Sequence, residues 1–195
     1  MIIATQNAGK AKEIRYIAGK KIKNIQTLDQ LGIILPENLE AFPDYQSNAM
    51  AKAQYVFNKT GIPVLADDSG LEVDALGSKP GIHSARYAPE GSDLANRNLL
   101  LDRLKGLCLE DRKASFVCIL CWICPLGIYF FEGRSHGLIL ERAIGEKGFG
   151  YDPIFFDPNL KKTYAELSFE EKMEVSHRGK ALEKWIDSIS TEGGI

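Results

Sequence analysis

The sequence lacks a strong excess of charge of either sign. Its 195 residues include 24 lysines and arginines and 26 aspartates and glutamates, so the formal net charge is only −2. A chain this close to neutral has no overall field to draw it to nucleic acid or to an anionic membrane. We therefore expect neither as a partner, and any recognition of phosphate must come from a local cluster of residues.

The sequence also has little that would direct it to a membrane or out of the cell. Its opening residues, MIIATQNAGK, lack the cationic stretch and long apolar run of a secretory signal. The most apolar stretch, 116–131, is interrupted by Pro125 and Gly127 and is too short to span a bilayer. We therefore expect a cytoplasmic location.

Cysteine is scarce, and its spacing is misleading. Three of the four cysteines, Cys118, Cys121 and Cys124, have a spacing found in iron–sulfur ligand runs. The surrounding segment, SFVCILCWIC, is more typical of a buried strand. Because side chains alternate between the faces of a strand, three thiolates spaced in this way cannot converge on one metal ion. We interpret these cysteines as small core residues.

The rest of the composition, 45% hydrophobic and 26% charged, is that of an ordinary globular protein. We predict strands at 2–5, 25–28 and 62–66 and a short continuing strand at 71–75. We also predict a hairpin of 114–124 with 127–135, and helices at 10–18, 47–59, 92–105, 168–175 and 178–190. Strands that alternate with helices and then form a hairpin indicate an α/β fold with a mixed twisted sheet flanked by helices. We expect one domain over residues 1–195, either undivided or with two lobes.

A polar turn between the first strand and the first helix, Thr5-Gln-Asn-Ala-Gly-Lys10, is a candidate for phosphate binding. Free backbone N–H groups and the helix dipole favour an anion at such a turn, and Lys10 adds a positive charge. The turn is not a Walker A motif, because the first glycine is absent and Ala11 replaces the required Ser or Thr. An ordinary capped helix would explain the same residues.

Two carboxylates, Asp67 and Asp68, follow the apolar residues 62–66. Alternation along a strand directs their side chains apart, so we expect only one of them to face a ligand. A carboxylate in that position can hold Mg²⁺ together with substrate phosphates and water, or accept a proton from an attacking water. A turn initiated by aspartate is the alternative interpretation.

Two later segments supply aromatic rings and hydrogen-bond donors. The glycine-rich segment 145–156 contains Phe149 and Tyr151, whose faces suit a flat ligand, although a surface loop with inward aromatic anchors would have the same composition. Further on, Lys172 precedes Ser176-His-Arg-Gly179 at the start of the last helix. Such donors suit a ring carbonyl or a phosphate oxygen, whereas a capped helix with solvated charges is the alternative.

Five blocks of sequence, in this order, resemble the inosine/xanthosine triphosphate pyrophosphatase family, the non-canonical purine NTP pyrophosphatases. They are TQNAGK at 5–10, ADDSGL at 66–71, PGIHSARY at 80–87, GFGYDPIF at 148–155 and SHRGKA at 176–181. The resemblance covers nearly the whole chain. It implies two lobes with a central nucleotide cleft, and hydrolysis of dITP, ITP and XTP to the monophosphate and pyrophosphate. It also implies Mg²⁺ as cofactor and a homodimer.

The resemblance also implies a role for each matching residue. Phosphate contacts fall to Thr5, Gln6, Asn7, Ala8, Gly9, Lys10 and Lys52. Asp68 matches the general base and metal ligand, Glu40 a second metal carboxylate, and Ser69 a residue beside the nucleotide. Recognition of the base falls to Phe149, Gly150, Tyr151, Asp152, Lys172, His177 and Arg178. The residues after Glu40 are Ala-Phe, where the family often has Thr-Gly.

Two other functions are compatible with a subset of these features. A pyrophosphatase for modified pyrimidine nucleotides belongs to a related fold family, but the Ser-His-Arg block and the Phe-Gly-Tyr-Asp loop argue against it. The intact set of Asp68, Lys10 and Lys172 argues against the second alternative, a nucleotide-binding sensor that has lost turnover.

Overall fold

The computed structural model describes residues 1–191, which pack as two compact units. Unit 1 comprises Met1–Asp68, Cys118–Gly133 and the chain from His177 onward, and unit 2 comprises Ser69–Val117 and Arg134–Ser176. Three long strands contribute residues to both units: β3 (Val64–Val73), β5 (Lys113–Cys124) and β6 (Gly127–Ile139).

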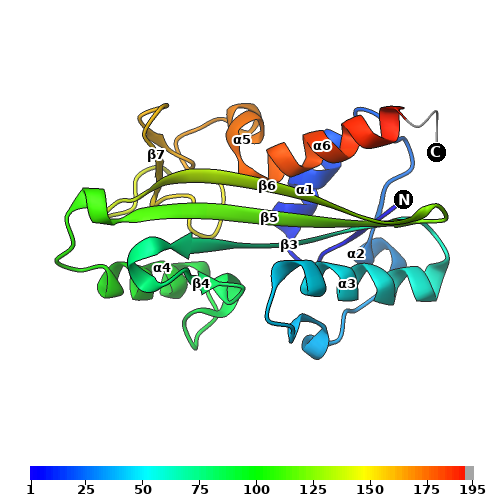
Figure 1. Cartoon of the computed structure of the whole chain (residues 1–195), viewed down its shortest axis with the longest axis horizontal. Coiled ribbons are helices and arrows are strands. Elements are labelled where there is room, and N and C mark those ends of the chain that lie inside the picture. The colour runs from blue at the N-terminus through cyan, green and yellow to red at the C-terminus, as the bar shows by residue number, and fades with distance from the viewer. Residues whose placement is uncertain (192–195) are drawn as a thin grey trace. The chain divides into compact units, whose positions relative to one another are not determined.

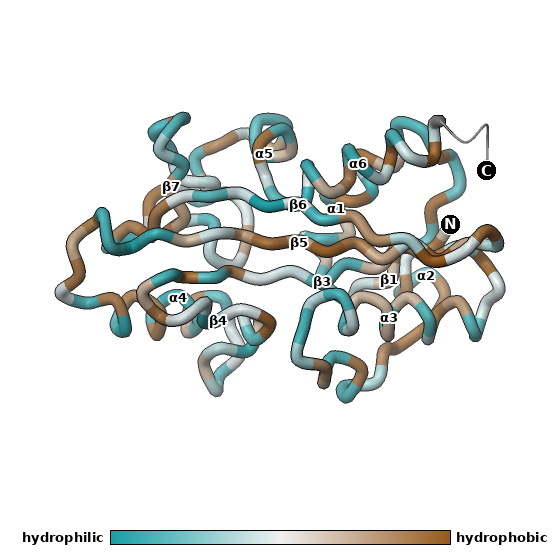
Figure 2. The backbone as a smooth tube through the Cα atoms, in the orientation of Figure 1, coloured by the Kyte–Doolittle hydropathy of each residue, from teal (hydrophilic) through white to brown (hydrophobic). Residues whose placement is uncertain are grey.

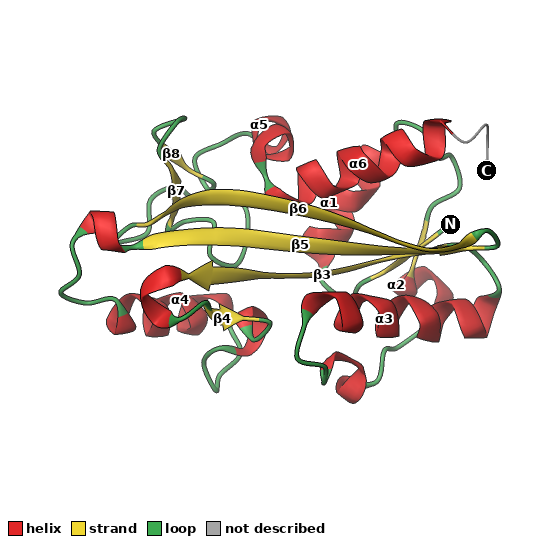
Figure 3. Ribbon diagram, in the orientation of Figure 1, coloured by secondary structure: helices red, strands yellow, loops and turns green. Residues whose placement is uncertain are grey.

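The remaining elements belong to one unit each (Figure 3). Unit 1 contains β1 (Ile2–Ala4), α1 (Ala8–Ala18), β2 (Gln26–Thr27), α2 (Leu28–Leu31), η1 (Glu37–Glu40), α3 (Tyr45–Thr60) and α6 (His177–Thr191). Unit 2 contains η2 (Asp74–Leu76), β4 (Lys79–Gly81), η3 (Ser84–Arg86), α4 (Asp93–Arg103), η4 (Leu109–Asp111), β7 (Phe155–Asp157), β8 (Lys162–Thr163) and α5 (Phe169–Val175).

The strands form a mixed sheet in the order β2-β1-β3-β5-β6-β7-β8, with β4 paired to β3. Strand β1 is parallel to both β2 and β3, whereas β4, β7 and β8 join by antiparallel pairing. Only two residues, Pro125 and Leu126, separate β5 from β6, and so short a connection requires antiparallel neighbours. The predicted mixed α/β fold is therefore confirmed.

In unit 1, helix α3 covers one face of the strands, and α1 and α6 lie side by side on the opposite face (Figure 1). Fully buried Ile2 and Ala4 of β1 lie in register with Val64 and Ala66 of β3. These four side chains belong to one apolar cluster with Ala49, Ala53 and Val56 of α3. The spacing of those three residues places them on one face of a helix, which is why α3 packs on the sheet.

In unit 2, α4 and α5 lie on opposite faces of the strands (Figure 1). Leu100 and Leu104, at the end of α4, belong to an apolar cluster with Phe116, Phe155 and Tyr164. The ring centroids of Phe116 and Phe155 are 4.5 Å apart. This core fixes α4 relative to the segment that leads into β7.

Most predicted elements are confirmed, but the strands expected at 62–66 and 71–75 form one continuous strand. It runs through both aspartates to Val73, because Leu71 and Val73 are fully buried and the last residues pair with β4. The short elements β4, β7 and β8 lie in segments where no strand was predicted, since two or three residues carry no detectable periodicity.

The three closely spaced cysteines are core residues, as predicted. Cys118 and Cys121 are fully buried, Cys124 is 4% exposed, and all three are free thiols. Burial raises the pKa of Cys121 to about 12. They lie on β5, which is largely brown in the hydropathy colouring of Figure 2. Within residues 1–191, no helix has the length and apolar character needed to cross a membrane.

The close approach of β6 to α6 depends on Gly133. A Cβ atom at this position would collide with the carbonyl oxygen of His177 and would lie 2.6 Å from the backbone nitrogen of Ala181. We expect Gly133→Ala to lower the free energy of unfolding by about 3 kcal/mol, measured by urea denaturation. Gly32→Ala is the control, because apart from its chain neighbours no described atom lies within 4 Å of the added Cβ. Its only expected cost is about 1 kcal/mol for an alanine at positive φ. Equal losses in the two variants would contradict this account.

Candidate functional site

The turn between β1 and α1 has the geometry of an anion-binding turn. The side chain of Asn7 caps α1 by accepting a hydrogen bond from the backbone N–H of Lys10 at 3.0 Å, and the Thr5 hydroxyl accepts one from the N–H of Asn7 at 3.2 Å. The amides of Ala8 and Gly9, at the start of the helix, have no acceptor within the helix itself. Gln6 is exposed beside them. The predicted phosphate loop therefore presents N–H groups and one lysine.

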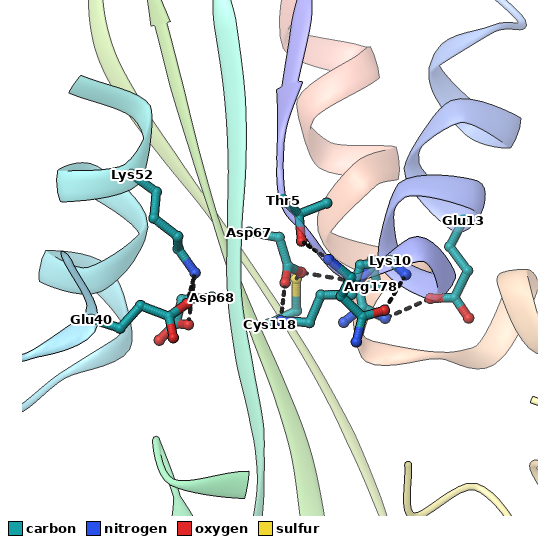
Figure 4. A network of polar contacts seen from close by, with 10 residues as sticks. Thr5, Lys10, Glu13, Glu40, Lys52, Asp67, Asp68, Cys118 and Arg178 are labelled. Carbon is teal, nitrogen blue, oxygen red and sulfur yellow. Dashed lines mark hydrogen bonds and ion pairs between the residues drawn. The ribbon is translucent and has the colours of Figure 1, made fainter. Parts of the chain in front are cut away.

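Asp67 and Asp68, consecutive residues of β3, point to opposite faces of the sheet (Figure 4). Asp67 faces α1 and α6, whereas Asp68 faces α3. Both carboxylates are buried, Asp67 completely and Asp68 with 7% of its surface exposed. The prediction that their side chains point apart is confirmed.

Asp67 is held by ionic and hydrogen bonds within unit 1. One carboxylate oxygen lies 2.5 Å from the ammonium of Lys10, and the other accepts from the Arg178 guanidinium at 2.9 Å and from the Cys118 thiol at 3.0 Å. Burial by itself would raise the pKa of Asp67. The positive charges of Arg178 and Lys10 outweigh it and hold the pKa well below the ordinary value of 3.8. Asp67 is therefore ionised in the folded protein.

The same network extends to Glu13 of α1. Its carboxylate lies 2.5 Å from the second guanidinium nitrogen of Arg178, and both side chains are only 2% exposed. Burial opposes the charge of Arg178, but Asp67 and Glu13 raise its pKa above the ordinary value. Two carboxylates and two cations thus balance within this buried network.

Neither Asp67 nor Glu13 received a role in the sequence analysis. No local signal in the sequence pointed to Glu13, because consecutive helix residues point in different directions and a glutamate before an apolar residue is ordinarily exposed. Its burial follows from the packing of α1 and from the distant Arg178.

On the other face of β3, Lys52 bridges two carboxylates. Its ammonium donates to Asp68 at 3.0 Å and to Glu40 at 2.7 Å, and its own surface is 4% exposed. Burial opposes the charge of Lys52, but Asp68 and Glu40 outweigh it and raise the pKa. The predicted Glu40, Lys52 and Asp68 are thus brought together, with two negative charges against one positive charge.

Asp68 is the least satisfied member of this group. Among residues 1–191, its second carboxylate oxygen, Oδ2, is buried and has no hydrogen-bond partner. Burial raises the pKa of Asp68, although Lys52 and Lys10 act in the opposite direction. A buried carboxylate oxygen whose lone pairs meet no hydrogen-bond donor among the described residues is an available ligand for a cation. When ionised, it is also an available acceptor for a proton.

The residues of unit 1 fit a divalent cation that arrives with a phosphate ligand. The described part of the chain contains no group of three or more His, Cys, Asp or Glu side chains arranged to hold a metal ion. Mg²⁺ does not require one, because it is commonly bound through one or two carboxylates together with substrate phosphates and water. Asp68 and Glu40 provide such a pair, and the excess negative charge favours a cation there.

In unit 2, the loop over residues 148–152 is organised by Asp152. Its carboxylate accepts from the backbone N–H of Phe149 at 2.9 Å and pairs with the ammonium of Lys172 at 2.5 Å. The same ammonium lies 4.6 Å from the centre of the Phe149 ring. The predicted residues Phe149, Asp152 and Lys172 therefore form one cluster.

The two aromatic residues of this loop differ in their environment. Phe149 is partly exposed, whereas Tyr151 is 4% exposed and donates its hydroxyl to the carbonyl of Ser84 at 2.8 Å. Tyr151 thus fits the alternative given for this segment, a surface loop with aromatic side chains packed inward. Phe149 is only partly buried, so it remains the candidate for contact with a flat ligand.

Three further predicted residues, Ser69, His177 and Arg178, stand at or next to positions in the sequence where the chain passes from one unit to the other. Ser69 is the first unit 2 residue of β3, and His177 and Arg178 open α6 in unit 1. Arg178 is engaged by Asp67 and Glu13, and Lys172 by Asp152. The assigned roles in binding and catalysis stay predictions.

The α/β fold, the N–H-bearing turn and the lysine-bridged carboxylates define a protein with a candidate phosphate and cation site. The chain belongs to the Ham1 family, whose sequence model matches residues 1–188. It is 44% identical to the "dITP/XTP pyrophosphatase" of Clostridium perfringens and 43% identical to that of Thermus thermophilus, over 96% of this chain and 96% and 90% of the relatives. The solved Staphylococcus aureus Ham1 protein matches with a TM-score of 0.85 and 37% identity, covering 98% of both chains.

The network around Asp67 predicts a stability effect with a defined pH dependence. We expect Asp67→Asn to lower the free energy of unfolding by about 3 kcal/mol at pH 7, since it leaves buried cations without a full countercharge. The folded-state pKa lies below the ordinary 3.8, so this contribution is fully present above pH 3.8 and is lost as the pH falls through the folded-state pKa. Urea denaturation of metal-free protein between pH 3 and pH 7 measures it.

The matched control for this prediction is Glu72→Gln. Glu72 pairs with Arg134 at 2.6 Å, but both side chains are partly exposed, and such pairs contribute less than about 1 kcal/mol. A loss in Asp67→Asn no larger than in the control, or a loss that already shrinks between pH 7 and pH 5, would contradict the assignment.

Proposed function

We propose that this chain hydrolyses the non-canonical purine nucleoside triphosphates dITP, ITP and XTP to the monophosphate and pyrophosphate, and so removes them from the nucleotide pool. Membership of the Ham1 family and relatives named dITP/XTP pyrophosphatase support the activity. The structural observation that carries it is the buried Asp68 Oδ2, which lacks a hydrogen-bond partner among the described residues beside Lys52 and Glu40. The chain is accordingly a nucleoside triphosphate pyrophosphatase.

The triphosphate is bound by the residues of the first turn and by two lysines. The amides of Ala8 and Gly9 point out of the start of α1 and suit phosphate oxygens. Lys10 has three N–H donors, of which Asp67 engages one at 2.5 Å, and Lys52 adds a second ammonium. Asp67 thereby holds Lys10 in position while leaving donors for phosphate.

Asp68 and Glu40 would hold Mg²⁺, the cofactor that we propose for this reaction. Bound there, Mg²⁺ would polarise phosphoryl oxygens and neutralise developing charge. Asp68 also accepts the proton of the attacking water, a role supported by its available Oδ2 atom and by the burial that raises its pKa. Attack on the α-phosphorus then releases pyrophosphate, whose charge the two lysines offset.

Selectivity for the base follows from the pattern of donors. Inosine and xanthosine carry an oxygen at purine position 6, where adenine carries an amino group. We propose that Lys172, His177 and Arg178 supply donors to that oxygen and that the ring of Phe149 stacks on the base. An adenine amino group would face these donors, and each polar group left unpaired costs about 1–3 kcal/mol. A cytoplasmic homodimer is the proposed working form.

The activity is tested by a panel of dITP, XTP, GTP, ATP and dUTP with magnesium, measuring monophosphate and pyrophosphate separately. We expect rapid release of pyrophosphate from dITP and XTP. ATP should react about tenfold to a hundredfold more slowly, as the loss of one hydrogen bond predicts. Preference for dUTP would instead indicate a pyrimidine enzyme, and release of inorganic phosphate without pyrophosphate would contradict the proposal.

The control in the same assay is Asp68→Asn, which keeps the shape of the side chain. We expect its turnover to fall at least about a hundredfold, because the proton acceptor and the cation ligand are lost together. The midpoint of thermal unfolding should change little, since burial already disfavours the ionised carboxylate. Activity within about tenfold of the wild type would reject the role of Asp68.

A further inference from the structure

Helix α4 holds both backbone groups of a single loop residue, Gly150. The carboxylate of Asp93 accepts from the Gly150 N–H at 2.7 Å, and the guanidinium of Arg97 donates to the Gly150 carbonyl at 2.7 Å. Asp93 and Arg97 are one helical turn apart on the same face. All of these residues belong to unit 2, and the function proposed above gives neither side chain a role.

Helix α4 is a firmly fixed support. The Ser92 hydroxyl caps its first turn by accepting from the Ala95 N–H at 3.1 Å. Buried Asn96 accepts from the backbone N–H of Ala88 at 2.8 Å and donates to the carbonyl of Ala85 at 3.1 Å. Leu100 and Leu104 are fully buried in the core of the unit. The position of Asp93 and Arg97 is therefore set by the core rather than by the loop.

The loop depends on this support at Gly150. Gly150 has φ of 59°, in the left-handed region, and no described atom lies within 4 Å of the position where a Cβ would stand. Two bonds close within the loop, from the Asp152 N–H to the Phe149 carbonyl at 3.1 Å and from the Phe149 N–H to the Asp152 carboxylate at 2.9 Å. Tyr151 and Asp152 are also bonded to Ser84 and Lys172 of the same unit. The bonds to α4 are the ones that hold the backbone of Gly150 itself.

The orientation of Phe149 follows from the path of its backbone. Its ring is only partly buried, so core packing does not hold it as it holds Tyr151 on the other side of Gly150. The ring lies against the ammonium of Lys172, 4.6 Å away. A shift of Gly150 would therefore move the ring and change its relation to Lys172.

We propose that Asp93 and Arg97 are positioning residues for base selectivity: by holding the N–H and carbonyl of Gly150, they set the placement of Phe149 against Lys172. The inference rests on the proposed function, because it assigns these two loop-facing residues to discrimination between oxopurine and aminopurine triphosphates. Neither side chain needs to touch the nucleotide.

The test compares variants that remove each hydrogen bond with variants that keep it. Asp93→Ala removes the acceptor, whereas Asp93→Asn keeps an acceptor oxygen in the same place. Arg97→Met removes the donor, whereas Arg97→Lys keeps one. The measured quantity is the ratio of kcat/KM for dITP over dATP, together with KM for dITP and the midpoint of thermal unfolding.

We expect Asp93→Ala and Arg97→Met each to lower the dITP/dATP ratio about fivefold to tenfold, the effect of one hydrogen bond on a bound group. KM for dITP should rise more than kcat falls, because Asp68 and the lysines are untouched. Asp93→Asn and Arg97→Lys should restore most of the ratio. The double variant should lose less than the product of the two single losses, since both residues hold the same glycine.

Controls on the same helix are Asp102→Ala and Arg103→Met. Arg103 donates to the Tyr87 hydroxyl at 2.7 Å, so its loss removes a comparable bond that does not involve the loop. These variants should leave the dITP/dATP ratio within about twofold of the wild type, even where they change the midpoint of thermal unfolding.

The outcomes separate the inference from the function on which it rests. The inference is overturned, and the proposed function stands, if the wild type is active on dITP and the dITP/dATP ratio is unchanged in Asp93→Ala and Arg97→Met. Equal losses in the loop-facing and control variants, or no recovery in the conservative variants, also overturn it. A wild type that releases no pyrophosphate from dITP overturns both.

Discussion

The site in unit 1 depends on a constraint of strand geometry: consecutive residues of an extended strand must point to opposite faces of the sheet. In β3 those residues are Asp67 and Asp68. Asp67 therefore meets Lys10, Arg178 and Cys118, whereas Asp68 meets Lys52. Two chemically identical neighbours thus acquire different properties, one with a lowered pKa and one with a raised pKa.

This division separates a network of balanced charges from a group with an unsatisfied oxygen. The Asp67 network balances its charges and links α1, α6 and β3 through fully buried groups, so it stabilises the fold only while it stays complete. The group around Asp68 carries an excess of negative charge and a buried oxygen, Oδ2, without a hydrogen-bond partner among residues 1–191. Such an arrangement costs stability and is typical of a site that awaits a ligand. Lys10 connects the two, since Asp67 positions it and we propose that phosphate takes its remaining donors.

The sequence was sufficient for the fold class, the polar turn before the first helix and the divergence of the two aspartates, because each follows from local periodicity and strand geometry. It was insufficient wherever a contact joins distant segments. Glu13 and Arg178 are 165 positions apart, and Gly150 is 53 positions from Arg97. The continuity of β3 through residues 67–70 was also missed, since it depends on burial of the strand and on pairing with β4. No local pattern encodes these long-range partners.

The most direct test of the account is an NMR titration of the two side-chain carboxyl groups in metal-free protein, repeated with Mg²⁺ and a non-hydrolysable dITP analogue. The account predicts that Asp67 titrates below the ordinary 3.8 under both conditions. It predicts that Asp68 titrates above 3.8 in the free protein and moves to a lower pKa when the cation and nucleotide bind. An Asp68 carboxyl whose pKa is unchanged by the ligands, or an Asp67 carboxyl that titrates above 3.8, would contradict it.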